Sequence, residues 1–269
     1  MTLRGSAILS AALIVLITAL PVVAQDEAQD EAQSEGQSEW LGWVQIYTGI
    51  NQVNGTNTVG DISFGVDSRS GDLEWVWGFS TGAWKGRWGG QVEMNWTSVE
   101  HSDVLYSDGQ ITVNGSLEAS NLILEADAFF RALGGDAKGL DIIAGVRSYR
   151  MENSWAITSN QVQFGSIDDN GSVNESWVDP LIAVRVVGNT DNQFWGAFRV
   201  EMGGFGVGSD PMWGIRAQAG LRWQQTDWSL GLRHYDIKYN NGESGDAYFS
   251  TDSAHSQFLF IFGYRFSDA

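Results

Sequence analysis

Ten stretches of this chain alternate apolar or aromatic residues with polar ones, and the links between them alternate short and long from Trp43 to Phe266. In the segment from Trp213 to Trp223, one parity is entirely apolar and the other carries two arginines. Because successive residues of a strand point to opposite faces, each stretch is predicted to be a strand with one apolar and one polar face. Strands joined by short and long links in turn are typical of an up-and-down antiparallel β-barrel.

The predicted strands span about residues 43–53, 72–84, 87–99, 117–133, 140–151, 177–188, 194–204, 212–223, 227–239 and 256–266. Most of them reach the roughly 9–11 residues that a tilted strand needs to cross a bilayer. The short links are residues 85–86, 134–139, 189–193 and 224–226, and the long links are 54–71, 100–116, 152–176, 205–211 and 240–255. An even number of strands places both termini on the short-turn side, which is the periplasmic side of outer-membrane barrels. A barrel of eight strands, or of twelve if residues 57–66 join the sheet, is the alternative.

The N-terminal region predicts export. Arg4 precedes an apolar run that ends at Leu20, and Val22-Val23-Ala24 offers small residues to a signal peptidase, so residues 1–24 are predicted to be a signal peptide. No later apolar run approaches the roughly 18 residues of a spanning helix, so a membrane-resident chain has to cross by strands. Residues 25–39 hold six acids, no base and no aromatic or β-branched residue, and are predicted to be a disordered periplasmic tail before a barrel domain of residues 40–269. A soluble periplasmic β-protein is the alternative.

Charged residues of both signs share the polar parity of the predicted strands, and we expect them to line the lumen as a mutually paired network. Sliding one strand by one residue would move its arginines into hydrocarbon, at about 2–4 kcal/mol each near the bilayer midplane. We interpret the network as structural rather than as a catalytic or selectivity site. Its predicted members are Glu93, Glu125, Asp127, Arg131, Arg147, Arg185, Arg199, Glu201, Arg216, Arg222, Arg233 and Arg265.

Aromatic residues mark the two predicted membrane interfaces. Indole rings at both ends of the strands are typical of an aromatic girdle. The predicted girdle is Trp75, Trp84, Trp88, Trp96, Trp177, Trp213, Trp223 and Trp228. One parity of the last strand is wholly aromatic from Phe258 to Phe266, which resembles the strand by which outer-membrane barrels are recognised for assembly, although it ends three residues before the last residue given.

The chain also resembles a widespread, largely uncharacterised group of bacterial outer-membrane barrel proteins. The segments that carry this resemblance are Gly86-Arg87-Trp88-Gly89, Asp141 to Tyr149, Trp177-Val178-Asp179-Pro180, and Gly203 to Asp210 followed by Trp213. The resemblance implies a barrel in the outer membrane and no established activity.

The sequence contains no complete catalytic, phosphate-binding or metal-binding motif. The absence of cysteine removes disulfides, thiol nucleophiles and thiolate metal sites. The glycines of residues 203–210 are interpreted as a loop between strands, because no phosphate-binding lysine follows them. His101 and His255 lie near predicted loop ends, but His255 and Ser256, beside Asp252, point to opposite faces of a strand. Residues 168–171 lack the full ligand spacing of a calcium loop. No catalytic residue, metal or cofactor is predicted.

The predicted function is therefore a narrow or plugged pore, or an envelope-anchoring barrel, with a charge-paired lumen. The alternative is a surface binding protein, because the five long links hold 13 acids and only Arg69 as a base. A hydrolase at the rim is a third hypothesis. The expected partners are outer-membrane lipid and lipopolysaccharide, divalent cations at the acidic loops and, through the last strand, the barrel-assembly machinery. The net charge of −18 argues against nucleic acid.

Overall fold

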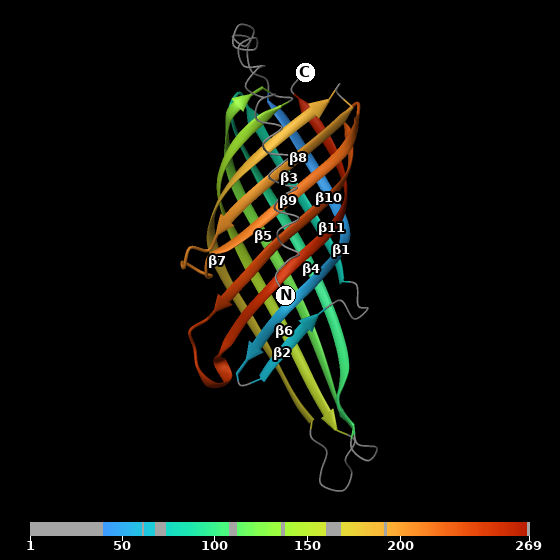
Figure 1. Ribbon diagram of the computed structural model, residues 1–269, viewed down its shortest axis with the longest axis vertical. Helices are drawn as coiled ribbons and strands as arrows, with labels where there is room; N and C mark the ends of the chain where they lie inside the picture. Colours follow the sequence, from blue (N-terminus) through green and yellow to red (C-terminus); the bar gives the residue numbers. More distant parts are fainter. Residues whose placement is uncertain are drawn as a thin grey trace, which may run out of the picture.

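The chain folds into a closed antiparallel barrel of ten strands with one extra strand outside the ring (Figure 1). The computed structural model describes residues 40–60, 62–67, 74–107, 112–135, 138–159, 168–190 and 193–267. The strands are β1 (Leu41–Val59), β2 (Ile62–Asp67), β3 (Glu74–Lys85), β4 (Trp88–Ser107), β5 (Thr112–Gly134), β6 (Gly139–Ser159), β7 (Asp168–Thr190), β8 (Phe194–Gly203), β9 (Met212–Trp223), β10 (Thr226–Asn240) and β11 (Phe249–Ser267). The ring closes because β1 pairs with β3 along one edge and with β11 along the other.

All ten predicted strands are present, but three of the predicted long loops are wrong in large part. β1 continues to Val59, β4 continues to Ser107, and β6 and β7 extend to Ser159 and from Asp168. These extensions pair with one another well past the predicted strand ends. On β1 and β7 the outward residues of the extensions are polar, as at Asn54 and Asn174, which removes the alternation on which the prediction rests.

The two alternative strand counts are also wrong. Residues 62–67 do form a strand, β2, but it pairs only with the far end of β1 and adds nothing to the ring. The short links fall where they were predicted, at the ends of β3, β5, β7 and β9. The glycine-rich link after β8 is a loop in which Gly204 has a φ of 80°, a conformation that favours glycine. The predicted signal peptide and tail lie outside the described residues.

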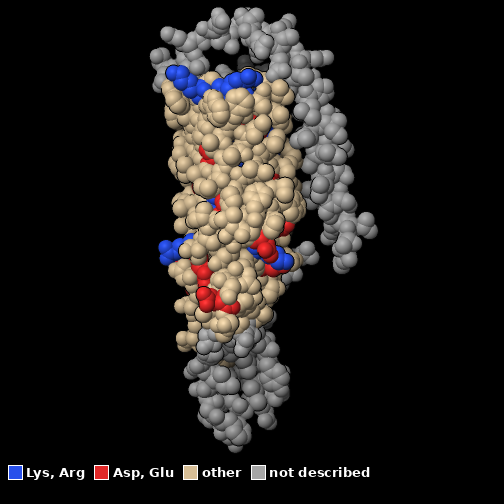
Figure 2. Space-filling model, turned by 90° about the vertical axis from the view of Figure 1, so that its left-hand side faces the viewer, with Lys and Arg blue, Asp and Glu red and all other residues tan. Residues whose placement is uncertain are grey.

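The outward face carries a continuous apolar belt. Leu230 and Trp77, both on this face, expose 50% and 54% of their surface. Toward the long-loop end the belt stops sharply: on β10, Leu232 is followed on the same face by His234 and Asp236. Figure 2 shows charged side chains gathered toward the two ends of the described surface, with an almost uncharged band between them. Such a belt is stable against lipid and unfavourable against water, so the strands cross a membrane.

No helix within the described ranges is long and apolar enough to span a membrane.

The lumen is filled by side chains at its long-loop end. Trp177 lies between Tyr149 and Tyr239, with ring centroids 4.8 Å and 3.9 Å away and nearly parallel planes. Around these rings pack Ile237 and Phe249, which are completely buried. This end of the barrel therefore contains a packed group of aromatic and aliphatic side chains, and we call these five residues the apolar plug.

The belt gives a test of the barrel's orientation toward lipid. Leu230→Arg places a guanidinium in the middle of the belt, and we expect it to lower the free energy of unfolding in liposomes by about 2–4 kcal/mol. Asn54→Arg, on the outward face of β1 beyond the belt, should cost at most about 1 kcal/mol. Denaturant titration of protein refolded into liposomes measures both, and equal costs would contradict the placement of the belt.

Candidate functional site in the barrel lumen

The middle of the lumen contains a closed cluster of four carboxylates and four guanidinium groups, all on inward-facing positions. We call it the central ion cluster. Its members are Glu93, Glu125, Asp127, Glu201, Arg147, Arg199, Arg216 and Arg233. All but Arg216 are less than 10% exposed, so each charge depends on its partners rather than on water.

Like charges are neighbours at two places on the wall of this cluster, where they meet opposite charges across the lumen. Arg147 on β6 also meets Glu125 on the neighbouring strand. Glu93 on β4 is paired in register with Glu125 on β5. On the opposite wall Arg216 on β9 lies between Arg199 on β8 and Arg233 on β10. The side chains then reach across: a nitrogen of each of Arg199 and Arg216 lies 2.9 Å from a carboxylate oxygen of Glu125, and Arg233 is 2.9 Å from Glu93. Neighbouring like charges destabilise a sheet, so the cross-lumen pairs are what makes this wall possible.

Two further clusters lie between the central ion cluster and the short-turn end. In one, Asp141 accepts hydrogen bonds from Arg131 and from Arg185, whose Nε is 2.9 Å away. In the other, Asp227 lies 3.0 Å from Nε of Arg222 and 3.3 Å from Nε of Arg265. Each cluster has two arginines and one carboxylate. We call these the two-arginine clusters, and each carries one positive charge in excess.

The exposure of these groups differs by sign. The side chains of Asp141 and Asp227 are 0% and 6% exposed, whereas those of the four arginines range from 11% to 31%. The carboxylates therefore sit in the wall, and the guanidinium groups reach the open space of the lumen.

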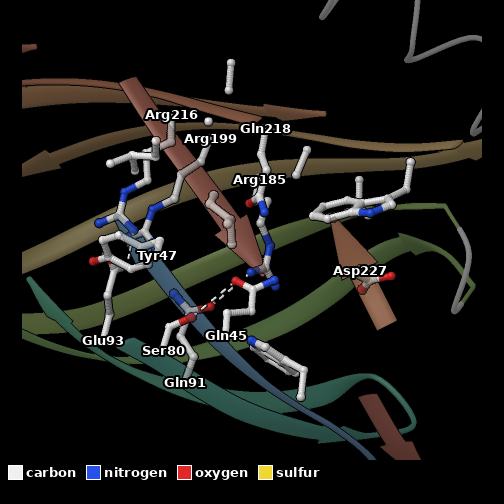
Figure 3. Close-up of a pocket in the computed structure, with 18 of the residues that line it drawn as sticks. Gln45, Tyr47, Ser80, Gln91, Glu93, Arg185, Arg199, Arg216, Gln218 and Asp227 are labelled. Atoms are coloured by element: carbon white, nitrogen blue, oxygen red, sulfur yellow. Dashed lines mark hydrogen bonds and ion pairs between the residues drawn. The ribbon is translucent and has the colours of Figure 1, made fainter. Parts of the chain in front are cut away.

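That space is a recess of about 210 Å³ at the short-turn end of the barrel. Figure 3 shows Arg185, Arg199 and Arg216 projecting into it from one side, with Gln45 and Gln91 opposite. Arg185 donates to Gln91 across 3.1 Å, and Gln91 in turn donates to Asp127 across 2.8 Å. Polar amides and guanidinium groups thus form one continuous hydrogen-bonded surface.

Three tryptophans, Trp43, Trp84 and Trp195, complete the wall of the recess. The indole N–H groups of Trp84 and Trp195 are buried and find no hydrogen-bond partner among the described residues. Buried donors normally have an acceptor, so these two indole N–H groups are exceptions among the described residues. The Arg222 guanidinium lies 5.8 Å from the Trp195 ring centroid, a contact that holds it at the wall.

The structure places all twelve residues of the predicted charge network on the inner face of the barrel. Sequence reasoning missed two of their acidic partners, Asp141 and Asp227. Asp141 has the same parity as Arg147 on β6, and Asp227 the same parity as Arg233 on β10, so the signal that could have found them was present.

The predicted aromatic girdle is wrong for two residues. Trp75, Trp88, Trp96, Trp213, Trp223 and Trp228 expose 39–73% of their surface on the outward face. Trp84 instead lines the recess, and Trp177 belongs to the apolar plug. Both have the inward parity of their strands, which position near a strand end does not reveal.

The structure also bears on the two weaker chemical motifs, a catalytic group at His255 and a calcium loop at residues 168–171. His255 is 1% exposed inside the barrel, where it contacts Asn51 and Ser253, while Ser256 faces outward, so these neighbours do not act together. Residues 168–171 belong to β7 rather than to a loop. The side chain of His101 lies outside the described part of the chain. The described residues contain no group of three or more metal-ligating side chains arranged around one point.

No protein-family model matches the chain, and no curated protein matches it. Among solved structures, the outer membrane protease OmpT of Escherichia coli aligns with a TM-score of 0.49 and 10% identity over 84% of this chain and 97% of its own. The translocator domain of the autotransporter NalP of Neisseria meningitidis aligns with a TM-score of 0.41 and 12% identity over 96% and 97%. Ail of Yersinia pestis aligns with a TM-score of 0.30 and 11% identity over 84% and 99%. With its ring closed and its apolar belt turned outward, this chain is an outer-membrane β-barrel.

The central ion cluster predicts an asymmetry between two glutamates. Glu125→Gln leaves buried guanidinium groups without their shared carboxylate, and we expect it to lower the free energy of unfolding by about 3–5 kcal/mol. Glu152→Gln removes an exposed carboxylate paired with Arg150 and should cost less than about 1 kcal/mol. Denaturant titration of both variants in the same detergent checks the difference, and a Glu125 variant as stable as the Glu152 variant would disprove the role of the cluster.

Proposed function

We propose that this protein is a non-conducting outer-membrane barrel whose arginine-lined recess binds small dianionic molecules from the periplasm. The observation that carries the proposal is the excess of two positive charges in the two-arginine clusters, next to an open recess in the lumen.

Occlusion is supported by two filled layers in series. A ligand or ion that enters from the short-turn end meets the central ion cluster, in which Arg147 and Glu201 are 1% and 3% exposed. Beyond it lies the apolar plug, in which the Trp177 ring stacks between Tyr149 and Tyr239. Barrels of about eight strands are filled by their own side chains, and wide aqueous channels appear at about 16 strands. A ten-stranded barrel is close to the narrow end of this range, so an occluded lumen is expected.

Anion binding is supported by the charge balance of each layer. The four carboxylates of the central ion cluster are matched by four arginines, so this layer offers no net attraction. The excess charge lies at the recess, on guanidinium groups that are only partly satisfied by one carboxylate per pair. Arginine forks match the paired oxygens of carboxylates and phosphates.

Occlusion is tested by single-channel recording of the refolded full chain in planar bilayers. We expect no reproducible open level, because both layers have to be displaced before ions can pass. A general porin added afterwards to the same membrane provides the positive control. A stable, large conductance from this chain would exclude an occluded lumen.

Ligand binding is tested by calorimetric titration of the refolded full chain with succinate and with inorganic phosphate. Arg185→Gln and Arg222→Gln should each weaken binding about tenfold or more, since each removes a charge-assisted hydrogen bond. Arg150→Gln, an exposed arginine on the outward face, is the matched control and should bind as the unchanged chain does. Succinamide, which has the shape of succinate without its charge, should not bind. Equal binding of succinamide, or no binding of either anion, would refute the proposed ligand class.

A further inference from the structure

A row of three polar side chains crosses the outward face where the apolar belt ends. Ser256 on β11 is paired in register with His234 on β10 and, on its other side, with Gln52 on β1. All three positions have outward parity, so their side chains lie on the surface that faces lipid and its headgroups. None of the three belongs to the lumen or to the recess.

Ser256 and His234 are in direct contact. The Ser256 Oγ lies 2.9 Å from Nδ1 of His234. The other ring nitrogen, Nε2, lies 3.6 Å from Oδ1 of Asp236, two residues further along β10. A carboxylate beside Nε2 favours the tautomer that carries its proton there, which leaves the Nδ1 lone pair directed at the serine hydroxyl. This is the relation between nucleophile, base and orienting acid that activates a serine.

Trp213 on β9 holds the histidine and the aspartate in place. Its ring centroid is 5.2 Å from that of His234, at an interplanar angle of 49°. The Trp213 indole also donates a hydrogen bond to the Asp236 carboxylate. The His234 and Asp236 side chains are 32% and 36% exposed, so a substrate and water both have access.

The row lies between the last apolar pair and the first charged residues of the outward face. On the belt side of it, Leu232 and Phe258 are paired in register and expose 58% and 46% of their surface. On the other side come Asp236, the small Ala254 and the ion pair of Lys238 with Asp252 at 3.4 Å. The boundary between an apolar and a polar row is where acyl chains meet headgroups. A lipid resting on Leu232 and Phe258 would therefore present its ester carbonyl to Ser256.

We propose that Ser256, His234 and Asp236 form a hydrolytic site for acyl esters of lipids in the outer leaflet. Ser256 Oγ attacks the ester carbonyl carbon while its proton passes to Nδ1 of His234. The carbon–oxygen bond to the lipid alcohol then breaks, and the alcohol leaves with that proton. Water attacks the acyl-serine in the same way, releasing the fatty acid and restoring Ser256. Asp236 is the positioning residue for His234, and the Gln52 carboxamide beside Ser256 is the donor available to the oxyanion.

The first test measures fatty acid released from phosphatidylethanolamine in mixed micelles with the refolded full chain. We expect release above that of heat-denatured protein, and a loss of about a thousandfold or more in Ser256→Ala. Ser250→Ala, on the same face of the same strand, is the matched control and should keep full activity. Heat-modified migration on gels verifies that each variant is folded.

A second test is independent of turnover. A fluorophosphonate should form a covalent adduct with Ser256, identified by mass spectrometry, as serine Oγ displaces fluoride at phosphorus. Labelling should be absent in Ser256→Ala and strongly reduced in His234→Ala. Asp236→Asn should lower kcat about a hundredfold with an unchanged KM, which a purely structural role would not produce.

Each result of these two tests either supports or overturns the hydrolytic site. Lipid hydrolysis that depends on Ser256 and His234, together with labelling of Ser256, supports the site. Activity retained in Ser256→Ala, or neither hydrolysis nor labelling in the folded chain, overturns it. Hydrolysis of a soluble ester without release from phosphatidylethanolamine would overturn the assignment to lipid. Because none of these residues touches the recess, the result does not depend on anion binding there.

Discussion

The rest of this structure depends on one constraint, which is that arginines placed on membrane-crossing strands have to be hidden from hydrocarbon and matched with carboxylates. The barrel meets it by pairing across the lumen as well as between neighbouring strands. Glu93 and Glu125 stand side by side, as do Arg199, Arg216 and Arg233, and each row is neutralised by the other. Strands that are far apart in the ring are thereby coupled in register, since a slip of one strand would break pairs with several others.

This arrangement divides the lumen into layers with different uses. The central ion cluster has as many carboxylates as arginines, and the apolar plug carries no charge. A surplus of positive charge remains at the short-turn end, because Asp141 and Asp227 are each shared by two arginines beside the recess. The binding site that we propose lies at this end, where surplus charge and open space coincide.

Parity within a strand was readable from the sequence, and partners between strands were not. Alternation placed the twelve charged residues inward and located all ten strands, because both follow from the two-residue repeat of a strand. The extension of β7 was missed because its outward residues, among them Asn170 and Asn174, are as polar as loop residues. Trp84 and Trp177 were assigned to the girdle from their position near strand ends, although their parity points inward. Which carboxylate meets which arginine depends on the register of distant strands, which no local pattern records.

The same distinction explains why the serine and histidine on the outward face went unnoticed. Sequence neighbours drew attention to His255 beside Ser256, but alternation sends the first into the lumen and the second toward lipid. The residue that Ser256 does meet, His234, lies 22 positions away and is brought to it only by the pairing of β10 with β11. The two side chains are accessible although they lie in the middle of regular strands, because every outward position of a barrel is at the surface. Ser256 and His234 differ from other outward pairs in their position along the barrel axis, because they directly follow the last apolar pair, Leu232 and Phe258. At this boundary a lipid ester and water would meet.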